Sequence, residues 1–199
     1  MNEFWAAITG AVVGGLFVIL AQLISNVAQR RSDRETERRV INGTLKAIKA
    51  ELNVLKTGNF DPLQKELQDR AREREELRTN KRNPLPPLVM RRTEQNYLIV
   101  FESNAAALGR IDDENLREKI ISVYVHAKVI FDALNHHSVQ FDRWDRLPPN
   151  YALPATSEKQ EVESMLEAME DGILNGLGRF QEGLAELIPH IEKYLKRAR

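Results

Sequence analysis

A group of histidine and aspartate side chains is the part of the chain whose residue types could bind a metal ion. His136 and His137 are adjacent, and Asp142 and Asp145 follow them. Imidazole and carboxylate groups together can hold a divalent metal ion. Neighbouring residues of a helix point about 100° apart, so both histidines could bind one ion only where the helix has ended. Polar residues are common where a helix ends before a proline-rich loop. We therefore interpret this group as ordinary polar residues at a helix end, and we expect no metal and no cofactor.

Other signatures of catalysis are missing from the sequence. The chain contains no cysteine, which excludes thiol catalysis and thiolate zinc sites. It also contains no glycine-rich phosphate loop, His-Glu-x-x-His or Gly-x-Ser-x-Gly motif. His126 and His190 lie in helical patterns and are expected to be structural. The formal net charge is zero, which gives no reason to expect nucleic-acid binding. We therefore expect a protein without enzymatic activity.

The elements that would position functional groups begin with a long apolar run at the N-terminus. No charged residue occurs from Phe4 to Val27, and the run Phe4–Ile24 is long enough to cross a hydrocarbon core of about 30 Å. A cleaved signal peptide would start with basic residues and have a shorter apolar core. We therefore predict an uncleaved transmembrane anchor. Its principal residues are Phe4, Trp5, Gly10, Gly14, Phe17 and Leu20.

The residues after the anchor predict its orientation. Lysine and arginine side chains are absent before the run, and five arginines follow it: Arg30, Arg31, Arg34, Arg38 and Arg39. Because cytoplasmic flanks carry the excess of basic residues, we expect a single-pass protein whose C-terminal domain is cytoplasmic. These arginines form either an ordinary flank or a surface that faces anionic lipid. Gly10 and Gly14 have the small-xxx-small spacing that lets two helices approach closely in lipid, so self-association is a further expectation.

Behind the anchor, the chain reads as helices with apolar stripes. A narrow seam with steps of four and three residues predicts a helix that packs in a bundle or coiled coil. Its members are Ile41, Leu45, Ile48, Leu52 and Leu55. Gly58 is expected to end this helix, and Asp61 to cap the next one. That next helix, to about Arg78, is dense in charge and reads as a solvated arm.

Three further helical segments follow the charged arm. The first is expected over 93–108, and the second is capped by Asp112 and carries the broadest apolar stripe. The last begins with a capping box at Ser157 and should bend or break at Pro189. Its acidic side could pair with the arginines of the arm. The sequence leaves open whether the arm packs on its own bundle or on a neighbour.

The predicted fold is therefore all-α, with one N-terminal transmembrane helix followed by an antiparallel helical bundle that carries a charged helical arm. The expected divisions are an anchor over 1–29, a juxtamembrane helix over 30–57, the arm and a proline-rich connector over 58–92, and the bundle over 93–199.

The leading functional hypothesis is a membrane-tethered helical binding or scaffolding module. It would act at the cytoplasmic face through protein–protein contacts, with self-association as an added feature. The alternative is a holin-like or toxin-like effector that oligomerises through Gly10 and Gly14 and permeabilises the bilayer. A third hypothesis is a spanin-like lysis protein, which requires the opposite topology. The sequence identifies neither the partner nor the oligomeric state.

Overall fold

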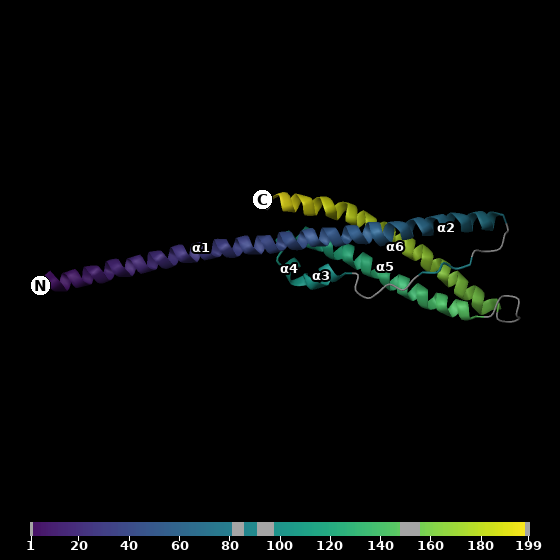
Figure 1. Ribbon diagram of the computed structural model, residues 1–199, viewed down its shortest axis with the longest axis horizontal. Coiled ribbons are helices and arrows are strands. Elements are labelled where there is room, and N and C mark those ends of the chain that lie inside the picture. The colour runs from purple at the N-terminus through teal and green to yellow at the C-terminus, as the bar shows by residue number, and fades with distance from the viewer. Residues whose placement is uncertain (1, 81–85, 91–97, 148–155, 198–199) are drawn as a thin grey trace. The chain divides into compact units, whose positions relative to one another are not determined.

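A computed structural model describes the backbone of residues 2–80, 86–90, 98–147 and 156–197. Within these ranges it describes side chains from Gln29 onward, except at residues 156 and 157, and those of Gln22, Ser25 and Asn26. The described residues form helices joined by turns, and no strand occurs among them (Figure 1). The all-α class is therefore confirmed for this part of the chain. The chain divides into two units, Met1–Gly43 and Thr44–Arg199.

The first unit is the N-terminal part of helix α1, which runs from Asn2 to Val54. The predicted anchor Phe4–Ile24 has a helical backbone, but Gln22 is its only residue with a described side chain. The anchor side chains named above therefore lie outside the described residues. Among the residues that are described, no helix is both long and apolar enough to cross a membrane. The five arginines of the basic flank are exposed.

The second unit is built around two antiparallel helices, α5 (Glu114–Arg146) and α6 (Thr156–Arg197). Gly183 of α6 approaches Val123 of α5, and Gly176 approaches Ile130, so residue numbers fall along one helix as they rise along the other. The predicted stripe of α5 is confirmed, because every member is buried: Leu116, Ile120, Val123, Tyr124, Ala127, Ile130, Phe131 and Leu134.

The expected break in the last helix does not occur, because α6 continues through Pro189. A proline inside a helix removes one hydrogen bond and costs about 3 kcal/mol. Leu184, Leu187 and Ile191 around it are at most 3% exposed. Burying three such side chains stabilises the packed helix by more than that cost. His190, which follows the proline and was expected to be structural, lies with its Nε2 3.0 Å from Asp113 Oδ2.

The C-terminal part of α1 continues into the arm without an interruption. A π-helical turn, η1 (Leu55–Phe60), joins it to α2 (Asp61–Thr79). The prediction that Gly58 ends the helix was therefore wrong, as was the assignment of Asp61 as a side-chain cap. Phe60 is fully buried, with its ring 5.3 Å from that of Phe131 and 4.8 Å from that of Phe180. This packing holds the wide turn against α5 and α6.

The four members of the predicted seam that lie in the second unit are buried. Leu45, Ile48, Leu52 and Leu55 are at most 2% exposed. Ile41, the first member of the predicted seam, falls in the first unit. The seam therefore serves the core of the chain's own bundle.

Two short helices replace the single helix expected over 93–108. They are α3 (Ile99–Ser103) and α4 (Ala105–Leu108), and residues 93–97 lie outside the described part. The carboxylate of Glu51 accepts hydrogen bonds from the amides of Val100 and Phe101, at 2.8 and 3.3 Å, and so binds the start of α3.

The side chain of Asn104 donates to the Val100 carbonyl, which helps to end α3 where the prediction continued it. The cap of α5 is Asp113, which accepts from the Leu116 amide at 3.0 Å, rather than the expected Asp112.

Candidate functional site

The histidine and aspartate group singled out in the sequence does not converge on one point. His137 is fully buried, and its Nε2 lies 3.7 Å from Oε1 of Glu170, which is beyond hydrogen-bond distance. His136 is exposed on the same helix. Across the described ranges, no cluster of three or more histidine and acidic side chains could hold a metal ion. The buried histidine instead belongs to a different polar cluster.

That cluster is a ladder of ion pairs between α2 and α6. Three arginines spaced four residues apart on α2 meet carboxylates of α6 in four ion pairs: Arg70 with Glu170, Arg74 with both Glu170 and Asp171, and Arg78 with Glu167. The four N–O distances range from 2.8 to 3.3 Å. Residues four apart share one helix face, so the ladder follows directly from the spacing. The charged arm therefore packs on its own chain.

Glu170 is the centre of the ladder and is only 1% exposed. Burial alone would raise the pKa of Glu170. His137, the amide of Leu88 and the charges of Arg70 and Arg74 together lower this pKa by more than burial raises it, so it lies below the ordinary value. Glu170 is therefore ionised at neutral pH. A buried carboxylate of this kind is stable only while its cationic partners stay in place.

The same carboxylate fixes the segment 86–90 against the helices. The Leu88 amide donates to Glu170 Oε1 at 3.1 Å, and the Arg70 guanidinium donates to the Pro86 carbonyl. Met90 is 6% exposed. The described segment 86–90 of the predicted proline-rich connector therefore forms part of the wall of a pocket.

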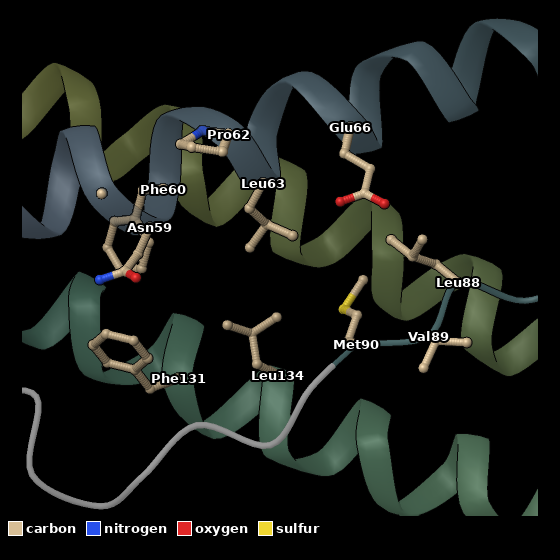
Figure 2. Close-up of a pocket in the computed structure, with 11 residues that line it drawn as sticks. Asn59, Phe60, Pro62, Leu63, Glu66, Leu88, Val89, Met90, Phe131 and Leu134 are labelled. Carbon is tan, nitrogen blue, oxygen red and sulfur yellow. The ribbon is translucent and has the colours of Figure 1, made fainter.

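The pocket lies between η1, α2, the segment 86–90 and α5, and Figure 2 shows its lining. Its volume is about 350 Å³, which is near the lower end of ligand-site volumes. The side chains of Leu63, Met90 and Leu134 point into the space from three sides (Figure 2). Among the described residues, the lining consists of Gly58, Asn59, Phe60, Pro62, Leu63, Glu66, Leu88, Val89, Met90, Phe131 and Leu134.

The mouth of this pocket is open and carries one acidic group. Val89 is 67% exposed at the rim, and Glu66 directs its carboxylate toward the space beside Met90 (Figure 2). Within the described part of the chain, Glu66 takes no part in the ion pairs or hydrogen bonds, whereas Arg70 one turn later is fully engaged. The site is therefore an apolar hollow with the carboxylate of Glu66 at its edge.

The wide turn of η1 provides one end of the pocket. A π-helical turn carries one more residue than an α-helical turn, and such turns are frequent at functional sites. Gly58 and Asn59 of this turn reach the pocket surface, and Phe60 anchors the turn in the core. Because of the extra residue, the helical backbone continues without a break, while the side chains after the turn are rotated about the helix axis relative to those before it.

A second exposed apolar surface lies on α5, where Ile121, Val125 and Val129 are about half exposed. They follow one another at four-residue steps and form a single row. Exposed apolar side chains are normal on protein surfaces, and nothing in the structure indicates what would cover this row. It does not define a site.

The sequence did not identify the pocket as a site. Its apolar lining residues were assigned to the core, to the charged arm or to the connector, and Glu66 was one of many charges on the arm. Comparison of the chain with models of known protein families, with curated proteins and with solved structures finds no match. The candidate site is therefore defined by its own geometry.

Proposed function

We propose that this chain is a membrane-tethered helical binding module that acts at the cytoplasmic face by contacting another protein. The observation that supports this proposal most directly is the open apolar pocket beside segment 86–90. An apolar hollow that stays exposed has a cost in water, and a partner that covers it would remove that cost. Among the described lining residues, Glu66 is the one titratable group, and no second group stands beside it to form a catalytic pair.

The tether in this proposal is the apolar run Phe4–Ile24, and the five arginines after it give the orientation. Holding a binding module at a membrane raises its effective concentration toward partners on the same surface. Even a weak contact at the pocket would then be sufficient for recruitment.

Two experiments on the full-length protein test the tether and its orientation. The chain should remain in the membrane pellet after alkaline carbonate extraction, because only an integral anchor survives that treatment. A C-terminal reporter should be active on the cytoplasmic side. Release of the chain by carbonate would exclude the anchor, and a reporter active only outside the cytoplasm would favour the spanin-like hypothesis.

Binding is tested by quantitative co-purification of the full-length chain from detergent-solubilised membranes. A Leu63→Trp variant fills the pocket from a half-buried position and should lose the partner. The matched control is Leu77→Trp, which places the same bulk at a half-buried position of α2 outside the pocket. A binding module requires at least one protein enriched equally with the parent chain and with Leu77→Trp, but not with Leu63→Trp. The absence of any such protein would contradict the proposal.

A membrane effector is the second candidate, and the Gly10 and Gly14 spacing favours it. It requires the anchors to assemble and permeabilise the bilayer. Dye entry on induction of the protein, abolished by Gly14→Ile, would support this candidate. An unchanged membrane potential at high expression would exclude it.

A further inference from the structure

The walls of the pocket at η1, α2 and segment 86–90 are already formed and firmly held. Phe60 is wedged between Phe131 and Phe180, and Leu88 is bound to the buried carboxylate of Glu170. A site whose walls do not move on binding avoids the entropic cost of ordering them. This rigidity means that even a small apolar group can be captured there.

The shape of the pocket favours a side chain that belongs to a larger partner over a free small molecule. Small-molecule sites usually bury 70–90% or more of their ligand. Here the rim residue Val89 is 67% exposed, and Glu66 and Pro62 are also exposed. A ligand lying in this hollow would keep one side in water. A protein segment that inserts one side chain and covers the rim with its backbone fits this geometry better.

The charge at the rim indicates which residue should accompany that side chain. Glu66 has no cationic partner among the described residues, and Arg70, the neighbouring cation on α2, is occupied by Glu170 and Pro86. An arriving carboxylate would meet the Glu66 anion, whereas an arriving ammonium or guanidinium would pair with it. Opposite charge at an interface edge gives specificity and faster association.

We propose that this pocket binds a bulky apolar side chain of a partner protein, with a lysine or arginine next to it that pairs with Glu66. The inference rests on the proposed binding function and names the chemistry of the partner. The apolar side chain supplies most of the affinity, because burying a Leu or Phe side chain increases affinity by roughly 10- to 100-fold. The cation at the exposed rim adds only about two- to five-fold.

The methyl group of Met90 is a reporter within the pocket. The chain has four methionines, and Met165 and Met169 are on α6 away from the pocket lining. The full-length protein, carrying ¹³C-methyl methionine in detergent micelles, would be titrated with capped dipeptides. The probes are acetyl-Phe-Lys-amide, acetyl-Phe-Glu-amide and acetyl-Ala-Lys-amide, with benzylamine as a free amine. A Met90→Leu variant assigns the reporting signal.

The expected result is a shift of the Met90 signal with the Phe-Lys probe, at constant Met165 and Met169 signals. Replacing Phe by Ala in the probe should weaken binding by at least about 10-fold, and replacing Lys by Glu by about two- to five-fold or more. Glu66→Gln should abolish the difference between the Lys and Glu probes. Glu73→Gln, an exposed position of α2 outside the pocket lining, should leave that difference unchanged.

Several results would overturn the inference. They are an unchanged Met90 signal with every dipeptide, equal affinity for the Lys and Glu probes, or benzylamine binding as tightly as the Phe-Lys probe. The last result would assign the pocket to a small amine. If one of these results occurs while co-purification still finds a protein that is lost with Leu63→Trp and kept with Leu77→Trp, the binding function holds and only the partner chemistry is wrong.

Discussion

Removing the carboxylate of Glu170 should destabilise the protein far more than removing any exposed acid of α6. Glu170 is 1% exposed, and the side chains of its partners Arg70 and Arg74 are 15% and 9% exposed. Breaking a buried ion pair by deleting one partner typically costs about 3–5 kcal/mol, because the other charge is left buried. Arg74 keeps Asp171 at 3.0 Å, so we expect Glu170→Ala to cost about 3 kcal/mol, near the lower end of that range.

The assay is urea unfolding of the full-length protein in micelles, followed by far-ultraviolet circular dichroism. The matched control is Glu167→Ala, whose partner Arg78 is 67% exposed. An exposed pair of this kind contributes at most about 1 kcal/mol. Changing Arg70, Arg74 and Glu170 together to methionine should recover most of the loss, since apolar replacement of a whole buried ion cluster is often neutral. Equal free-energy losses for Glu170→Ala and Glu167→Ala would refute the reasoning.

The remaining predictions concern the same unfolding measurement. Tyr124→Phe removes the hydroxyl that donates to Glu51 and should cost about 1 kcal/mol; no change would show that this bond does not hold α1 to α5. Gly183→Ala should cost up to about 2 kcal/mol, because the overpacking of a Cβ 3.1 Å from a valine of α5, about 1–3 kcal/mol, exceeds the gain of about 1 kcal/mol in helix propensity. Gly178→Ala, with nothing within 4 Å, should instead stabilise by up to about 1 kcal/mol, and a reversed order would contradict the α5–α6 packing. Since the folded-state pKa of Glu170 is lowered, its contribution is complete above the ordinary carboxyl pKa of about 4.3 and is lost as the pH falls through the folded-state pKa. The acid sensitivity of unfolding should therefore weaken in Glu170→Gln, and an unchanged pH profile would contradict that assignment.

The helices that pack in the core could be predicted from the sequence, because burial of apolar side chains determines their spacing. The stripe from Leu116 to Leu134 and the seam from Leu45 to Leu55 have the helical period, and the structure buries both. The helix of the charged arm also formed where expected, at Asp61–Thr79, but the prediction that it is solvated was wrong, because its Leu67 and Arg74 are buried. In these segments the local pattern and the tertiary packing favour the same structure.

Local stop signals were less informative, because packing outweighed them. Gly58 and Pro189 both predict helix ends, yet the helical backbone passes through both positions. At Gly58 the π-helical turn is held by the buried ring of Phe60, and at Pro189 the helix is held by the buried leucines beside it. A terminating residue costs about 1–3 kcal/mol, which is less than a neighbouring cluster of buried side chains supplies.

The ion-pair ladder and the pocket required three-dimensional information. The arginines of the arm and the acids of α6 suggested a pairing, but their spacing is equally consistent with contacts to a second chain. The pocket depends on segment 86–90 returning to α2 and α6, where Leu88 reaches Glu170. Nothing in the local pattern of a proline-rich segment specifies where it docks.

The most direct test of the tethered binding module is photo-crosslinking in cells from position 89 of the full-length protein, followed by analysis of the membrane fraction. A photoreactive amino acid at Val89 replaces a side chain that is 67% exposed at the pocket rim, and the same residue at Glu73 is the control. The proposal predicts an adduct between this chain and a different protein, found with membranes, specific to position 89 and lost in Leu63→Trp. Equal labelling from both positions, or adducts only between two copies of this 22.8 kDa chain, would contradict it.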